Sequence, residues 1–519
     1  MLNGGSNKEL PYVSRARRGQ FPSWSLEQGH RVRFPLHAYP SELLAEYHSY
    51  AGNAPDSGGW CWMFLWWLDG NFDRAHSKSQ FLIDYFRLPM SPPCELFLLL
   101  SGIHILSQRL MKNLFKIFLL GIGLLPTALL SEDWPTYRYD SRRSGVSSES
   151  LALPLSPAWR VQGGTPRQAW SGPAKWDAYS GNSGLQSMRN FDPCYYVTIS
   201  GDLVYYGSSH DNAVHALDRT TGKERWVFFA EAPVRLPPTI HDGIAFAGSD
   251  DGYLYALDAV KGTLLWKDRG SPDDRRIPSN ASMISLWPVR TAPLIVNDHL
   301  YYTASLTPWE SSWLISLDPR TGERHFAREV SNVTLQGALL ASADTLIAPQ
   351  GRSAPLLYEM KTGKPSGTIG HAGGVFCLVT EDNQFISGPK SQKAKDSQLF
   401  LTDSKGARVA TFNDTTCAVV TDGVAYHHTR GSLKALALGP DKEKSSQWSV
   451  ETPVPAELIV SSNAVFLGHS GGVQAYSRKD GTLLWETSIP GGGAVHGLAI
   501  SDKMLFVSDS LGSIHAFRP

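Results

Sequence analysis

The clearest alternation of hydrophobic and polar positions lies between residues 242 and 266. Two alternating segments, 244–248 and 253–258, are separated by a turn rich in Asp and Gly, and a third segment ends at Trp266. A period of two between such turns is typical of antiparallel strands. With the apolar run before it, the stretch predicts one four-stranded sheet. A single sheet of this kind has two open edges, so we expect copies to pack beside it.

Copies of this pattern recur along the chain. The position of the central residue of the segment 244–248 occurs eight times along the chain at a spacing of about 40 residues, which is the period of a propeller blade. The residues at this position are Tyr205, Phe246, Tyr301, Ile347, Ile386, Tyr426, Phe466 and Phe506. The sequence therefore predicts an all-β fold, an eight-bladed β-propeller.

The last repeat lacks an outer strand because the chain stops at Pro519. A segment that resembles the missing strand, 157–161, precedes the first blade, and its Trp159 corresponds to Trp226 and Trp266. We expect this N-terminal strand to complete blade eight and to close the ring, which leaves only short edges exposed.

The repeat consists of Gly-Ser, then Asp-Gly-x-Leu-Tyr-Ala-Leu-Asp, then Thr-Gly-Lys-x-x-Trp, over about residues 134–519. It resembles the pyrroloquinoline-quinone-like (PQQ-like) propeller repeat, most closely in blades one, two and seven. Proteins with this repeat include quinoprotein alcohol dehydrogenases and non-catalytic envelope propellers of the barrel-assembly lipoprotein type. The resemblance thus implies either a dehydrogenase that uses PQQ and calcium or an interaction platform without a cofactor.

The part before the repeat reads differently. Residues 1–110 show no sustained period, and we interpret them as a mis-assigned upstream start or a disordered extension. From Met111, two lysines, an apolar run and small residues predict a signal peptide over 111–131. A genuine cytoplasmic extension with a short signal anchor at 114–130 is the alternative. Both readings predict a secreted or periplasmic propeller without stable membrane insertion, with a lead-in at 132–156 packed across one face and the propeller at 157–519.

Charge points to no particular class of partner. The chain has 48 basic and 48 acidic residues, so nothing favours nucleic acid, and binding must depend on a local site. The longest loops lie in blades one to three, at 163–192, 268–290 and 307–310. Loops on a rigid scaffold commonly carry function.

Several side chains could form a ligand site beside the central channel. They precede the turns of the inner strands or lie in the 268–290 loop, and they are Arg235, Arg290, Gln336, His496, Arg275, Arg276 and Trp287. Arginines in such a rim could bind carboxylates or phosphates through bidentate hydrogen bonds. The alternative is that these arginines join neighbouring blades by bonding carbonyls and aspartates.

Redox chemistry finds little support in the sequence. The predicted mature region contains Cys194, Cys377 and Cys417, with no haem-attachment motif. It also lacks the adjacent cysteine pair that the resemblance to quinoprotein alcohol dehydrogenases implies. Cys377 and Cys417 occupy matching positions in successive blades, and we favour apolar packing over a disulfide. We read the acidic turn 250–252 as a hairpin turn and not as a calcium site.

These observations favour a secreted or periplasmic, non-catalytic PQQ-like propeller that binds an envelope protein or a small ligand, with no catalytic residues, no metal and no cofactor. One alternative is a PQQ- and calcium-dependent sugar or alcohol dehydrogenase. A second is a carbohydrate-binding propeller that uses Trp176, Trp287 and Trp309.

Overall fold

The computed structural model describes residues 132–169, 195–280, 282–351, 353–369, 373–389, 397–415, 417–438 and 446–519. The predicted upstream segment and signal peptide lie outside these residues, as do Trp176, Cys194 and most of the 163–192 insertion. Within the described residues, no helix is long and apolar enough to cross a membrane.

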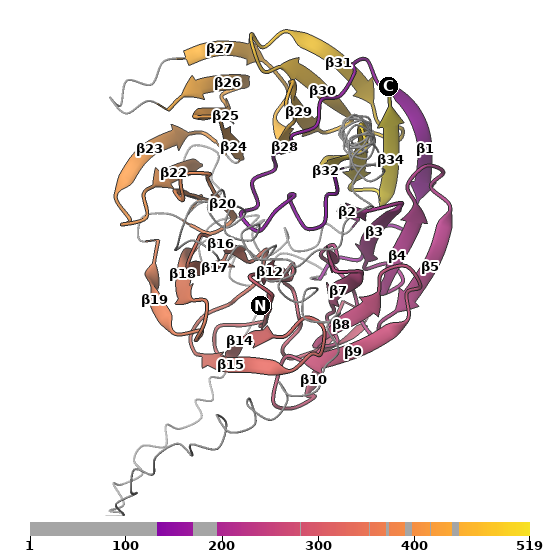
Figure 1. Ribbon diagram of the computed structural model, residues 1–519, viewed down its shortest axis with the longest axis vertical. Helices are drawn as coiled ribbons and strands as arrows, with labels where there is room; N and C mark the ends of the chain where they lie inside the picture. Colours follow the sequence, from indigo (N-terminus) through magenta and orange to yellow (C-terminus); the bar gives the residue numbers. More distant parts are fainter. Residues whose placement is uncertain are drawn as a thin grey trace, which may run out of the picture. The chain divides into compact units, whose positions relative to one another are not determined.

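Eight four-stranded antiparallel sheets surround a central axis, which confirms the predicted eight-bladed propeller (Figure 1). Blade one contains β2 (Val197–Ser200), β3 (Leu203–Ser208), β4 (Ala213–Asp218) and β5 (Glu224–Phe229). Blade two contains β6 (Thr239–His241), β7 (Ile244–Gly248), β8 (Tyr253–Asp258) and β9 (Leu264–Arg269). Blade three contains β12 (Leu294–Val296), β13 (His299–Ala304), β14 (Ser312–Leu317) and β15 (Arg324–Val330). Blade four contains β16 (Leu340–Ala341), β17 (Thr345–Gln350), β18 (Ser353–Glu359) and β19 (Pro365–Thr368).

The second half of the ring repeats this order. Blade five contains β20 (Phe376–Val379), β21 (Phe385–Gly388), β22 (Gln398–Thr402) and β23 (Arg408–Asn413). Blade six contains β24 (Ala418–Thr421), β25 (Val424–Thr429), β26 (Ser432–Ala437) and β27 (Ser446–Glu451). Blade seven contains β28 (Pro455–Val460), β29 (Ala464–His469), β30 (Gly472–Ser477) and β31 (Leu483–Ser488). Blade eight contains β32 (Val495–Ser501), β33 (Met504–Asp509), β34 (Ser513–Arg518) and, as its outer strand, β1 (Ser156–Gln162).

The ring closes where the sequence predicted. β1 pairs with β34 in antiparallel register, with Trp159 opposite Ala516 and Val161 opposite Ile514. The two ends of the propeller are therefore hydrogen-bonded within one sheet. Figure 1 shows them side by side at the outer rim.

Neighbouring blades are joined by an aromatic residue that packs on a glycine. The Trp159 ring lies against Gly222 of blade one, and the Trp226 ring lies against Gly262 of blade two. Both glycines have positive φ, and a Cβ would approach these rings to 2.7 Å and 2.5 Å respectively. Trp226 Nε1 also donates to Ala259 O at 3.0 Å. These tryptophans therefore pack blade against blade.

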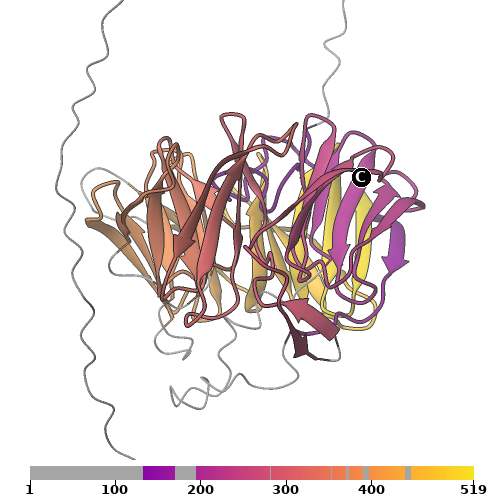
Figure 2. The ribbon, with the colours of Figure 1, turned by 90° about the horizontal axis from the view of Figure 1, so that it is seen from below.

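The turns between first and second strands, such as 201–202 and 502–503, lie on one side of the ring, which we call the turn face. The loops between blades and the turns between second and third strands, such as 230–238, 270–293 and 249–252, lie on the opposite side, the loop face. A two-stranded hairpin, β10 (Arg276–Ser279) with β11 (Ser282–Ser285), stands on the loop face. In Figure 2 this hairpin projects at the lower side of the ring.

The lead-in crosses the ring on the turn face and pairs with the inner strands. Its main chain bonds that of Ile199 in blade one, Ile240 in blade two and Val460 in blade seven. It also bonds the main chain of Ala341 and Val379 in blades four and five. The indigo segment that runs through the centre of Figure 1 is this lead-in. Because inner strands have free edges toward the axis, these bonds satisfy groups that would otherwise be buried unpaired.

Arg143 of the lead-in is fully buried near the axis. Its Nε donates to Leu339 O at 2.8 Å, and its second terminal nitrogen lies 3.4 Å from Ala292 O and 3.3 Å from Pro293 O. One guanidinium group therefore bonds the inner strands of blades three and four. Burial, with no carboxylate bonded to it, lowers the pKa of Arg143 to about 10.

Candidate functional site

Arg235 and Arg290 converge on one carboxylate, that of Asp250. Arg235 Nε donates to Asp250 Oδ2 at 2.7 Å, while Arg290 donates to both carboxylate oxygens at 2.7 and 2.9 Å. All three side chains are buried. Burial acts to raise the pKa of Asp250, but the two guanidinium groups outweigh it and lower this pKa below its ordinary value. The two arginines are thus bound to a turn of blade two, as in the alternative that they hold blades together.

Gln336 and His496 make different contacts. The Gln336 amide is buried and donates to Ser305 O at 3.0 Å and to Leu306 O at 3.2 Å. The His496 ring lies edge-on to Tyr196, with centroids 5.0 Å apart. These contacts all lie within the protein. A ligand-binding role for Gln336 and His496 stays a prediction.

Aromatic and ionised side chains meet where the lead-in fills the channel. Tyr137 of the lead-in packs edge-on against Tyr196 at 5.1 Å, and Arg138 forms a buried ion pair with Glu457 of β28. Burial, together with Glu457, raises the pKa of Tyr137 to about 12. Burial also raises the pKa of Glu457, against the opposing effect of Arg138. Burial also raises the pKa of Tyr196. At neutral pH Tyr137 and Tyr196 therefore keep their protons and can act only as neutral hydrogen-bonding groups.

The other predicted site residues, Arg275, Arg276 and Trp287, lie in or beside the β10–β11 hairpin on the loop face. The Arg275 guanidinium lies 4.6 Å from the centroid of the Trp287 ring, and Arg276 donates to Glu231 at 2.6 Å. The Trp287 indole N–H donates to Ser311 O at 2.7 Å, and its side chain is buried. Trp287 therefore offers no free ring face to a planar ligand.

The start of the 163–192 insertion lies across the loop face. Arg235 donates to Arg167 O at 2.8 Å, which places the insertion beside the Asp250 cluster. Ser279 Oγ of the hairpin donates to Ala169 O at 2.7 Å. Residues 163–169, the described part of the insertion, thus contact both Arg235 and the hairpin.

Exposed apolar side chains are found on the same face. Trp309 is 67% exposed, Phe229 64% and Met283 52%. Ala232, Ile284 and Leu306 form a small buried cluster nearby in the sequence. Of the three tryptophans proposed to bind sugars, Trp309 is exposed, Trp287 is buried and Trp176 lies outside the described residues.

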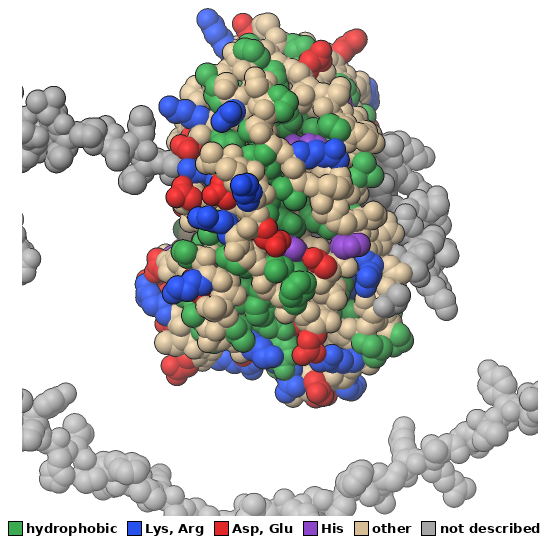
Figure 3. Space-filling model, turned by 90° about the vertical axis from the view of Figure 1, so that its right-hand side faces the viewer, with side chains coloured by type: hydrophobic (Ala, Val, Ile, Leu, Met, Phe, Trp, Pro, Cys, Tyr) green, Lys and Arg blue, Asp and Glu red, His purple; other side chains and the backbone are tan. Residues whose placement is uncertain are grey.

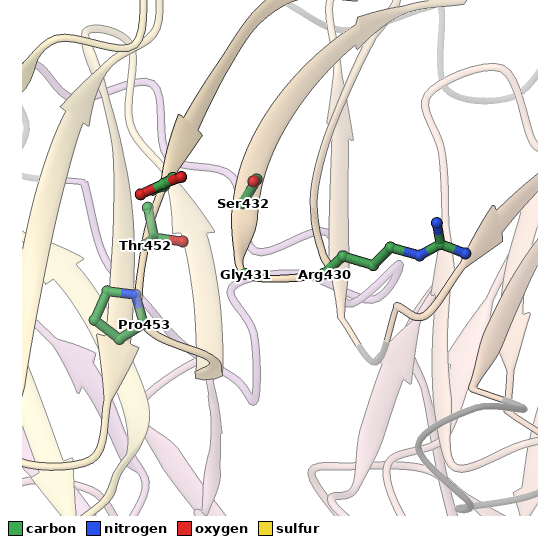
Figure 4. A pocket seen from close by; sticks show the side chains of 6 residues that line it. Arg430, Gly431, Ser432, Thr452 and Pro453 are labelled. Atoms are coloured by element: carbon green, nitrogen blue, oxygen red, sulfur yellow. The ribbon is translucent and has the colours of Figure 1, made fainter.

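A shallow hollow of about 510 Å³ lies at the end of blade six, beside the β25–β26 turn and the end of β27. It is lined by Arg430, Gly431, Ser432, Glu451, Thr452 and Pro453. Arg430 extends away from Thr452 and Pro453 in Figure 4 and donates to Asp414 at 2.7 Å. The guanidinium group of Arg430 is therefore not directed into the hollow.

Cys377 and Cys417 are not joined in a disulfide, in line with the packing interpretation. Burial raises the pKa of Cys377 to about 12, so this thiol stays protonated at neutral pH. A protonated thiol is a weak nucleophile.

Sequence reasoning missed a contact that recurs on the loop face, in which an aspartate bonds a histidine or a tyrosine. Asp251 accepts from Tyr255 Oη at 2.7 Å, and Asp509 lies 3.0 Å from His515 Nε2. In blade one, His215 lies between Asp211 and a glutamate. A turn aspartate followed by His or Tyr in the next strand was the available signal, and it recurs in blades one, two and eight.

The described residues contain no group of three or more His, Cys, Asp or Glu side chains that could hold a metal ion. In this part of the chain, the acidic turn at 250–252 is a hairpin turn between β7 and β8, as expected from the sequence.

Two curated proteins show sequence similarity. Over 310 residues, 59% of this chain and 68% of the relative, the chain is 23% identical to the outer membrane protein assembly factor BamB of Bordetella pertussis. It is 34% identical over 101 residues to the 1-butanol dehydrogenase (cytochrome c) of Thauera butanivorans. That second match covers 17% of this chain and only 14% of the dehydrogenase.

Solved structures show the same fold. Quinohemoprotein alcohol dehydrogenase from Comamonas testosteroni matches with a TM-score of 0.52 at 13% identity, over 74% of this chain and 80% of the other. A europium-containing methanol dehydrogenase matches with a TM-score of 0.53 at 13% identity, over 75% and 98% respectively. At these identities the likeness shows the propeller fold alone.

A family model described as outer membrane protein assembly factor BamB matches residues 159–420, which is half of the chain. This range begins in the closing strand β1 and ends in blade six. The chain belongs to this family of PQQ-like propellers.

Proposed function

We propose that this chain is a secreted or periplasmic, non-catalytic propeller that serves as a protein-interaction platform in the cell envelope. Its family and its BamB relative support an envelope role. The observation that carries the proposal is the Asp250 cluster, because the arginines best placed for an anionic cofactor are already neutralised inside the protein. The loop face then presents apolar side chains instead, among them Trp309 and Met283.

The described residues do not fit pyrroloquinoline quinone. A tricarboxylate would need unpaired arginines, but Arg235 and Arg290 bond Asp250. It would also need a flat ring to stack on, but Trp287 is buried beneath Arg275. Forming a quinone site here would require breaking the buried ion pairs of Asp250, which costs several kcal/mol of stability. We therefore derive no dehydrogenase step from this arrangement.

Cofactor reconstitution separates the platform from the dehydrogenase alternative. Purified chain is incubated with pyrroloquinoline quinone and calcium, and quinone binding is followed by calorimetry and dye-linked oxidation of alcohols and sugars. We expect no saturable binding and no turnover. Saturable binding with turnover would replace the proposal with the dehydrogenase.

Partner binding gives the positive test. The tagged chain, expressed with residues 111–131 in its native envelope, is isolated with its neighbours and the complex is rebuilt from purified components. We expect one defined envelope protein to bind without added cofactor. N-terminal sequencing of the exported protein tests the signal peptide, because a mature end upstream of Met111 contradicts it.

A further inference from the structure

The outer strand of blade one differs from the outer strands of the other blades. β5 ends in Trp226-Val227-Phe228-Phe229, four apolar residues in succession. In each of the other seven outer strands, the last four residues include a charged or polar side chain. These segments are WRVQ in β1, WKDR in β9, AREV in β15, PSGT in β19, ATFN in β23, WSVE in β27 and WETS in β31.

Charged and polar residues on an exposed edge normally prevent a further strand from pairing with it. β5 is the terminal strand of its sheet and pairs only with β4. Among the described residues, no main-chain group of β5 bonds a segment on its outer side. Half of its main-chain donors and acceptors therefore face outward, in the arrangement that accepts an added strand.

The two charged residues of β5 already have partners within blade one. Glu224 lies 2.9 Å from His215 Nδ1, and Arg225 lies 4.0 Å from Asp218. They stand at the start of the strand, on the turn face. The rest of the edge therefore carries no charge for a partner to neutralise.

The side chains of β5 divide between its two faces. Trp226 bonds Ala259 of blade two, and Phe228 packs against Tyr255 with centroids 5.2 Å apart. Since side chains alternate along a strand, Val227 and Phe229 point to the opposite face, away from blade two. Phe229 is 64% exposed, and Val227 is partly exposed. This pair forms the apolar contact available beside the open edge.

The outer wall of the ring agrees with this reading. In Figure 3 the right-hand side of the molecule faces the viewer, and apolar side chains gather along the middle of the wall. Blade one lies on this side in Figure 1, with β5 at the outer rim. An extended segment could therefore reach β5 from solvent.

We propose that the outer edge of β5 binds an extended segment of an envelope protein, which adds a fifth strand to blade one and places apolar side chains on Val227 and Phe229. This inference rests on the proposed platform function and names its contact. It requires a partner segment with alternating apolar residues and no charge opposite Phe229, because the edge itself carries none there.

Site-specific photo-crosslinking tests the inference in the full chain within its native envelope. A photoreactive benzoyl-phenylalanine replaces Phe229, and matched controls carry it at Leu265 of β9 or Leu484 of β31, exposed apolar positions on charged outer strands. We expect position 229 to give about tenfold more product than either control, which corresponds to about 1.4 kcal/mol of preferred contact. The product should map by mass spectrometry to one short stretch of one partner.

Charge insertion at the edge gives a second measurement. Phe229→Lys should weaken binding of the purified partner about tenfold, whereas Leu265→Lys should leave it unchanged. Circular dichroism of both variants checks that the ring is intact. Equal product from the three crosslinking positions overturns the inference, as does a product that joins position 229 to a second copy or to residues 170–194. A partner that binds Phe229→Lys normally overturns the inference but leaves the platform function standing.

Discussion

Two buried charged groups, one on each face of the ring, are held in opposite ways. On the turn face, Arg143 reaches the carbonyl oxygens of Leu339 and Ala292 and bonds no carboxylate. On the loop face, Asp250 sits between Arg235 and Arg290. The first arrangement satisfies backbone groups of the inner strands, whereas the second balances charge between blade loops.

The difference shows how each face can vary. The turn face depends on bonds from the lead-in, both main-chain bonds and those of Arg138 and Arg143, so its geometry is set by the path of one segment. The loop face depends on side-chain pairs, so insertions such as the β10–β11 hairpin can be accommodated around a fixed Asp250. Loop variation is therefore left to the loop face, around the Asp250 cluster.

The largest expected effect breaks the loop-face cluster. Asp250→Asn leaves two buried guanidinium groups without their counter-charge, and we expect it to lower the free energy of unfolding by about 3–5 kcal/mol. Urea unfolding at pH 7 measures the loss. Asp274→Asn, at an exposed hairpin position, is the control and should change stability by less than about 0.5 kcal/mol. Equal stability of the two variants would contradict the cluster's role.

The same variant predicts a pH dependence. Because the folded pKa of Asp250 lies below its unfolded value of about 3.9, its contribution is present above that pH and is lost as pH falls through the folded pKa. The stability difference between wild type and Asp250→Asn should therefore shrink below about pH 4. Unfolding measured at several pH values between 7 and 3 tests this sign. A difference that stays constant would show that Asp250 acts without its charge.

Arg143 on the turn face should contribute to the free energy of unfolding equally at neutral and at mildly acidic pH. Arg143→Ala leaves several buried carbonyl groups unpaired, and we expect a loss of about 3 kcal/mol with no added dependence on pH between 7 and 4. Denaturant unfolding at both pH values provides the measurement. Arg142→Ala is the adjacent control, since Arg142 is partly exposed and bonds only Asp140 among the side chains. A loss comparable to that of Arg143→Ala is not expected there.

A smaller effect is expected where the ring closes. Gly222→Ala places a Cβ 2.7 Å from the Trp159 ring at a positive φ, while Gly423→Ala has a similar φ and no atom within 4 Å. Gly423→Ala should cost about 1 kcal/mol from backbone strain, and Gly222→Ala about 1 kcal/mol more from the clash. Thermal unfolding of the two variants separates strain from packing. Equal losses would show that Trp159 moves aside freely.

Much of the fold could be predicted because its information lies in repeated side chains. The eight repeated strand positions, of which Phe246 is one, and the seam at Trp159 follow from spacing and residue type. The sequence indicated that the lead-in packs across one face, but its contacts with each blade could not be predicted, because most of them are main-chain bonds that leave no side-chain pattern. Nothing local in the sequence distinguishes Arg143 from its neighbour Arg142.

Only part of the candidate site could be predicted from the sequence, for a related reason. Arg235 and Arg290 were recognised, but their partner Asp250 lies in a turn whose Asp and Gly are explained by the hairpin itself. The pairing depends on blade loops that meet only after the ring has formed. Similarly, the open edge of β5 becomes visible only when all eight outer strands are compared as edges.

The smallest expected effect concerns the indole N–H that joins blades one and two. Trp226→Phe keeps most of the ring contact with Gly262 but removes the 3.0 Å bond to Ala259 O. Blade three shows that the substitution is compatible with the fold, since Phe326 packs on Gly363 in the same way. We expect a loss of about 1 kcal/mol, the usual contribution of one hydrogen bond. Thermal unfolding measures it, with Phe326→Leu as the control for ring contact alone, and a loss well above that value would show that Trp226 also supports β5.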